Sequence, residues 1–249
     1  MKRLVASYIA ISFLFFYDSS FAQTIIYPSA SSRQSFSFEM SGNPAFFIEG
    51  GYHYRIDNLI AGKSVIIHAI VGAPLFLLKE FDSFRFGLGG SVKWVKRGRF
   101  GFVSGLFTSI STNENVNGNS ISWNFKLNIL PGYYSENWFL ALDLAWKPTI
   151  ATNIKHSNYV KAAFKERYPD DTLKYAMIYG PKDGWYYTPA NRLMAGMLAG
   201  YTISGSYSIY INGGINYTPN NFGILMFGDI GVIPYYLKLG MVYHKINTL

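Results

Sequence analysis

His156 and Ser157 are adjacent residues of the two types that a serine hydrolase requires, a general base and a nucleophile. The two side chains must come within hydrogen-bond reach of each other before the serine is activated. On a strand, neighbouring side chains point to opposite faces, so this spacing does not fit the mechanism. Ser157 is better suited to cap a short helix that runs to Arg167, and we predict no catalytic residue.

Metal and cofactor chemistry have little support in the sequence. The four histidines, His53, His68, His156 and His244, lack the i, i+4 spacing of a transition-metal site, and the chain has no Cys. A glycine-rich phosphate loop or a dinucleotide fingerprint does not occur between a strand and a helix. The sequence therefore predicts no metal site and no cofactor.

The composition is unusual for a chain with a water-exposed surface. Of the 249 residues, 14% are charged and 18% are aromatic, whereas soluble domains have about 25% charged residues. The apolar content excludes a disordered chain, and the lack of Cys excludes a scaffold held by disulfides.

The amino terminus predicts export. Two basic residues precede an apolar stretch from Leu4 to Tyr17, and Ser20 and Ala22 occupy the minus-three and minus-one positions of a signal-peptidase site. We expect a signal peptide at 1–22 and one mature domain at 23–249. The alternative, an uncleaved anchoring helix, is disfavoured because the apolar run is shorter than the roughly 20 residues of a membrane span. Nucleic acid is a poor partner for an exported chain.

Downstream of the signal peptide, the dominant pattern is a two-residue alternation. Apolar and polar side chains alternate in Ile121–Ile129, Asn137–Lys147 and Ser206–Thr218. Such segments are long strands with one apolar and one polar face. Since no stretch of 18 apolar residues follows the signal peptide, helical membrane spans are excluded.

Alternation is also found in a soluble β-sandwich. The length of the strands and the residues at their ends distinguish a soluble sandwich from a membrane barrel. Soluble strands usually run about five or six residues and membrane-barrel strands about nine to eleven. Trp138 and Trp146 lie eight residues apart on one face, or roughly 26 Å along a strand. Aromatic girdles with this kind of spacing mark the two edges of a bilayer. The predicted girdle residues are Phe84, Trp94, Trp138, Trp146, Tyr207, Tyr217, Tyr235 and Tyr243.

The chain has a predicted signal peptide, and its mature part has alternating strands with aromatic ends. In these features it resembles the outer-membrane β-barrels of Gram-negative bacteria. The resemblance implies an all-β fold, a closed antiparallel transmembrane barrel, in the cell outer membrane and in contact with its lipids. We predict about 10–12 strands, because bacterial barrels have an even number. The eleven candidates lie near 34–41, 45–55, 63–72, 82–96, 99–111, 119–130, 136–147, 192–204, 206–218, 221–232 and 234–246.

The segment 148–191 does not alternate and carries ten charges. Besides the helix capped by Ser157, a second helix is expected from Asp170 or Asp171 to Tyr179. A loop of this length is usually functional or disordered. We therefore expect one long, partly helical external loop that plugs the mouth or shields the rim, and that could contact a small solute or a protein partner.

The polar strand faces predict the interior of the barrel. Positive side chains outnumber negative ones there, which favours anions if water passes; alternatively, the charges pair within a packed core. The leading hypothesis is a narrow pore or binding site for a small anionic or amphipathic solute, not an enzyme. A structural or partner-binding barrel is the alternative, and a membrane-embedded lipid hydrolase is third. The predicted lumen-lining residues are Glu39, Glu49, His53, Arg55, Arg85, Lys93, Lys126, Asp143, Lys147 and Lys238.

Overall fold

A computed structural model describes residues 32–43, 45–74, 84–97, 99–115, 118–167, 182–187, 191–217 and 235–246. The predicted signal peptide, the second predicted helix and the predicted strand 221–232 lie outside these ranges. The elements are β1 (Ser32–Asn43), β2 (Ala45–Ile60), β3 (Lys63–Pro74), β4 (Arg85–Arg97), β5 (Phe100–Asn115), β6 (Gly118–Tyr134), β7 (Trp138–His156), α2 (Asn158–Arg167), β8 (Gly184–Tyr186), β9 (Asn191–Ser204), β10 (Tyr207–Tyr217) and β11 (Tyr235–Ile246).

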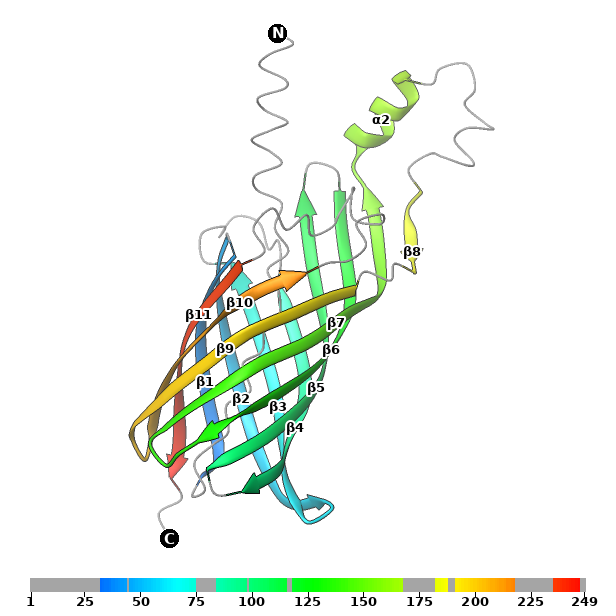
Figure 1. Ribbon diagram of the computed structural model, residues 1–249. Coiled ribbons are helices and arrows are strands. Elements are labelled where there is room, and N and C mark those ends of the chain that lie inside the picture. Colours follow the sequence, from blue (N-terminus) through cyan, green and yellow to red (C-terminus); the bar gives the residue numbers. More distant parts are fainter. Residues whose placement is uncertain are drawn as a thin grey trace.

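Ten of these strands form a closed antiparallel ring (Figure 1). Each strand pairs with its neighbour in sequence, β7 pairs with β9, and β1 pairs with β11 to close the ring. The short strand β8 lies outside the ring and pairs with β7 at Thr152–Ile154. The prediction of a barrel of about 10–12 strands is therefore confirmed, and β10 pairs directly with β11.

Burial alternates along the strands in the way that the sequence predicts. On β7, Leu140, Leu142 and Leu144 are exposed, while Ala141 and Asp143 between them are buried. Successive side chains of a strand point to opposite faces, so one face of the wall is apolar and outward, and the other lines the interior. Helices in the described ranges fall short of the length and hydropathy that a membrane-crossing helix needs.

The seam between the first and last strands is regular. Cα partners run from Gly42 opposite Leu237 to Gln34 opposite Lys245. Ser32 Oγ also donates a hydrogen bond of 3.0 Å to the Lys245 carbonyl oxygen. The ring is thus closed by these residues, which lie from 195 to 213 positions apart in the chain.

The two ends of the barrel differ. Short turns join β2 to β3 and β9 to β10, at the end where β11 finishes, whereas α2 and β8 lie beyond the opposite rim (Figure 1). The segment 148–191 differs from the expectation at its start, because β7 continues as strand to His156 and pairs with β6. Ser157 then caps α2: its Oγ accepts a hydrogen bond of 3.3 Å from the Val160 N–H.

Candidate functional site

The predicted lumen residues all lie on the interior face. Eight of them are buried, with at most 4% of their surface exposed: Glu39, Glu49, His53, Arg85, Lys126, Asp143, Lys147 and Lys238. The side chain of Arg55 is 12% exposed and pairs with Asp57 at 3.0 Å, near the β2–β3 turn. Lys93 is half-buried, with its Nζ 4.7 Å from the centre of the Tyr134 ring. Contact between these residues and a solute stays a prediction.

Acids and bases of the interior are partly paired with each other. Lys238 Nζ donates to Glu39 Oε1, and the Tyr210 hydroxyl donates to Glu39 Oε2 at 2.8 Å. Arg85 pairs with Glu49 at 3.5 Å, and its guanidinium carbon lies 4.1 Å from the centre of the Phe47 ring. These contacts fix charged side chains against the wall.

Asp143 accepts a hydrogen bond of 2.7 Å from the Asn212 amide. Asn212 is completely buried and lies on β10, whereas Asp143 lies on β7. Each of the three buried acids therefore has a defined neighbour on another strand.

The lumen-lining residues predicted from the sequence do not include one interior cation. Arg192, at the start of β9, is buried and lies directly opposite Lys147 of β7. Like charges that face each other across two strands destabilise a sheet. Arg85 and Lys126 are also close enough to Lys147 to repel it. Among the described residues, these four side chains, Arg85, Lys126, Lys147 and Arg192, form a cationic cluster.

The interior also contains an apolar cluster. Val103, Phe107, Leu130, Leu198 and Val242 pack with Ala141 and Tyr210 as one buried group. Apolar packing narrows the space through which a solute could pass, because barrels of this size can be filled by side chains.

All eight predicted girdle residues are exposed. Trp94, Trp138, Tyr207 and Tyr243 lie near the short turns, and Phe84, Tyr217 and Tyr235 lie toward the opposite ends of β4, β10 and β11. Trp146 lies near the middle of β7, close to the point where the pairing with β9 ends. Neighbouring rings also contact each other: Trp138 stacks on Tyr133 with ring centres 4.9 Å apart.

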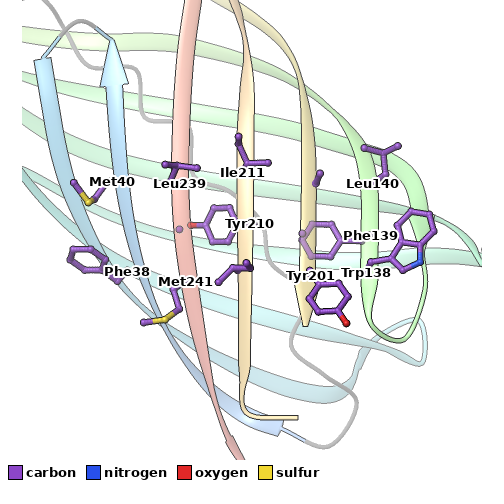
Figure 2. A pocket seen from close by; sticks show the side chains of 14 residues that line it. Phe38, Met40, Trp138, Phe139, Leu140, Tyr201, Tyr210, Ile211, Leu239 and Met241 are labelled. Carbon is purple, nitrogen blue, oxygen red and sulfur yellow. The ribbon is translucent and has the colours of Figure 1, made fainter. Parts of the chain in front are cut away.

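The outer wall contains an apolar groove of about 640 Å³ that crosses β1, β11, β10, β9 and β7 (Figure 2). Its side chains include Phe38, Met40, Leu140, Ile211, Leu239 and Met241. Gly200 and Gly240 lack side chains here, and the rings of Phe139 and Tyr210 occupy the space that a Cβ would enter. A polar solute would find almost no hydrogen-bond partner in this groove.

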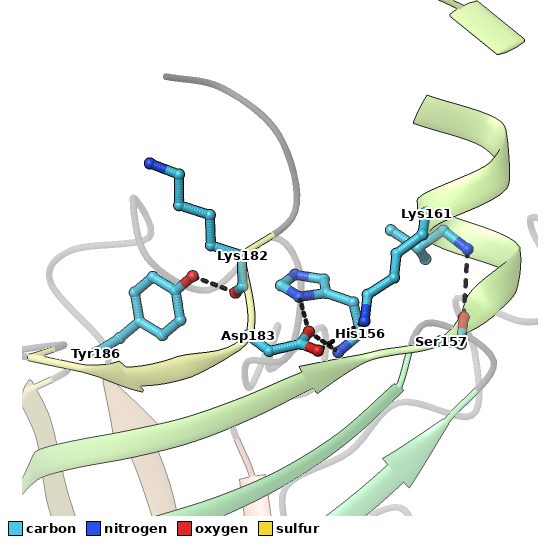
Figure 3. A network of polar contacts seen from close by, with 7 residues as sticks. His156, Ser157, Lys161, Lys182, Asp183 and Tyr186 are labelled. Carbon is cyan, nitrogen blue, oxygen red and sulfur yellow. Dashed lines mark hydrogen bonds and ion pairs between the residues drawn. The ribbon is translucent and has the colours of Figure 1, made fainter. Parts of the chain in front are cut away.

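His156 and Ser157 make contacts that hold the local structure. Asp183 accepts hydrogen bonds from the His156 N–H at 2.8 Å and from Lys161 Nζ at 2.6 Å, and the His156 Nδ1 lies 3.2 Å from the same carboxylate (Figure 3). We call His156, Lys161 and Asp183 the external clip. It joins the end of β7, the first turn of α2 and the start of β8.

The clip makes a specific prediction. The Lys161 ammonium and then the His156 N–H lower the pKa of Asp183 to about 2. A carboxyl whose pKa is lowered in the folded state stabilises the fold at pH values above its ordinary pKa of 3.8. That stabilisation is lost as the pH falls through about 2. At neutral pH, Asp183→Asn is expected to speed tryptic cleavage after Lys161 and Lys165 severalfold.

The matched control for this prediction is Asp57→Asn, which removes an exposed ion pair near the β2–β3 turn. It should leave cleavage of the external segment unchanged. Equal cleavage rates in wild type and Asp183→Asn would show that the clip does not hold the segment.

Within the described ranges, no three side chains of His, Asp or Glu converge as metal ligands would. The histidines nevertheless gather more closely than their sequence spacing indicates, since His53 and His68 contact each other on adjacent strands.

A closed ten-stranded antiparallel barrel with an apolar, aromatic-edged exterior and a charged interior defines a class of fold: the protein has the architecture of outer-membrane β-barrels. No protein-family model and no curated protein matches the sequence. Among solved structures, the chain is similar to one titled "KdgM porin", with 8% sequence identity, coverage of 85% of this chain and 99% of that chain, and a TM-score of 0.39.

Proposed function

We propose that the protein is a narrow passage or binding site for a small anionic or amphipathic solute in the outer membrane of a Gram-negative bacterium. In this proposal, residues 1–22 direct export, lipids cover the apolar outer wall, and the interior selects the solute. A non-enzymatic role is consistent with Ser157 acting as a helix cap.

The observation that carries the proposal is the excess of positive charge inside the barrel: among the described residues, five cations and three acids are buried. Lys147 and Arg192, which face each other across β7 and β9, belong to this excess. A lumen with more positive than negative side chains favours anions over cations.

Ion selectivity in a bilayer tests this proposal. Under a KCl gradient, the refolded wild type should give a reversal potential that indicates a preference for chloride, because cations in a narrow lumen favour anions. The double variant Lys147→Gln/Arg192→Gln should lose most of that preference. Lys63→Gln, which removes an exposed cation near the β2–β3 turn, should behave as wild type.

An unchanged selectivity in the double variant, or a wild type that prefers cations, would contradict the proposal. A folded barrel without conductance would instead favour a structural or partner-binding role. One observation supports that second candidate: Tyr159, Trp185 and Tyr187, beyond the rim, are 71%, 65% and 85% exposed. Large exposed aromatic side chains are typical of protein interfaces.

A further inference from the structure

Two buried histidines contact each other inside the barrel. His53 of β2 and His68 of β3 are direct cross-strand partners, and their Nδ1 atoms lie 2.7 Å apart. The other ring nitrogens are also engaged: His53 Nε2 lies 2.8 Å from Ser37 Oγ, and His68 Nε2 lies 2.8 Å from Ser91 Oγ. The two rings thus form one chain of hydrogen bonds across four adjacent strands.

A second chain continues around the wall from β1. His244 of β11 lies 3.1 Å from Ser35 Oγ through Nδ1 and 3.1 Å from Ser208 Oγ through Nε2. Ser208 in turn contacts Thr202 of β9 at 3.1 Å. The two chains together make a belt of imidazoles and hydroxyls that follows the wall from β4 to β9 by way of β1.

The number of protons on the His53–His68 pair determines whether its contact can exist. With both rings neutral, one Nδ1–H donates to the other Nδ1, and the two Nε2 atoms donate to or accept from the serine hydroxyls. One extra proton fits on an Nε2, which then donates to its serine. A second extra proton must go onto the accepting Nδ1, and two N–H groups then face each other, so the contact breaks.

We propose that the His53–His68 pair is a proton-controlled latch on the passage, which closes at neutral pH and opens on acidification. When both rings are protonated, β2 and β3 lose their side-chain link in the interior, and the lumen gains two positive charges. Both changes increase the passage of anions. The inference rests on the proposed function, because it assigns a regulation to the same interior.

Charged and titratable groups also lie on the strands that surround the pair. On β1, Glu39 lies two residues from Ser37, and on β2, Arg55 lies two residues from His53. On β4, Lys93 lies two residues from Ser91. Lys126 of β6 lies opposite Phe107 of β5, and His244 is on β11. The ring of Phe107 on β5 lies 5.3 Å from His68 and shields it on that side.

Conductance of the refolded full-length mature chain, recorded from about pH 7.5 to about pH 3, tests the latch. The wild type should show a reversible increase in conductance and chloride preference of severalfold. His53→Gln and His68→Gln keep a hydrogen-bonding side chain but cannot be protonated, so each should abolish the pH dependence. His156→Gln, at the end of β7 and beyond the part of that strand that pairs with β9, should retain it.

Nitrogen-15 NMR of the histidine side chains gives a readout that does not depend on conductance. At neutral pH the pair should show one hydrogen-bonded Nδ1–H, and its signal should disappear over the pH range in which conductance rises. Two rings that titrate independently, or a wild-type conductance that does not change with pH, would overturn the latch. A wild type that shows the shared proton but conducts at no pH would overturn the proposed function, and with it the latch as a control of passage.

Discussion

Glu39→Ala is expected to lower the free energy of unfolding by about 3 to 5 kcal/mol, the usual cost of removing one partner of a buried ion pair. Glu39 is 4% exposed and accepts hydrogen bonds from Lys238 of β11 and Tyr210 of β10. Removing its carboxylate leaves the Lys238 ammonium buried at the seam that closes the ring, with its main anionic partner lost.

Urea-dependent unfolding in detergent, followed by tryptophan fluorescence and heat-modifiable gel migration, measures this effect. The double variant Glu39→Met/Lys238→Met should recover much of the loss, because apolar side chains of similar size can replace a buried pair. Glu136→Ala removes an exposed carboxylate from the β6–β7 turn and should be nearly neutral. A loss below about 1 kcal/mol for Glu39→Ala would contradict the importance of the pair.

Leu142→Arg should destabilise the inserted barrel by about 2 to 4 kcal/mol, because a charged side chain on the lipid face is costly at the bilayer midplane. Leu142 is 49% exposed and lies midway between Trp138 and Trp146 on β7. Tyr217→Arg, at a position that is 61% exposed in the predicted girdle, should cost only about 0 to 1 kcal/mol.

Reversible folding into lipid vesicles is the suitable measurement, since the cost arises from the hydrocarbon around the wall. If Leu142→Arg were as stable as Tyr217→Arg, the apolar face would not lie in a membrane. A soluble barrel would tolerate both changes, because each side chain would already be exposed to water.

The sequence predicts those parts of the barrel in which each strand has two distinct faces. On β7, alternating leucines assign Asp143 and Lys147 to the interior without any knowledge of the other strands. The same logic fails for β9, where Met194 and Leu198 are buried beside Arg192, so the inward face of that strand is not distinguished by polarity.

Two further features depend on information that alternation does not contain. The contact between His53 and His68 requires the β2–β3 register, and β3 is apolar on both faces around His68. The extension of β7 beyond Pro148 was also not foreseen, since proline usually marks the edge or end of a strand. Here Pro148 lies opposite Asn191 at the start of β9, where the β6–β7 register is irregular, so its missing N–H is tolerated.

The seam between β1 and β11 has a consequence for biosynthesis. Because the ring is completed by its first and last strands, a chain that ends before Tyr235 would leave β1 and β10 each with a free edge. Unpaired strand edges are templates for aggregation. A product without β11 would therefore expose the edges of β1 and β10 and would be prone to aggregate before it could insert.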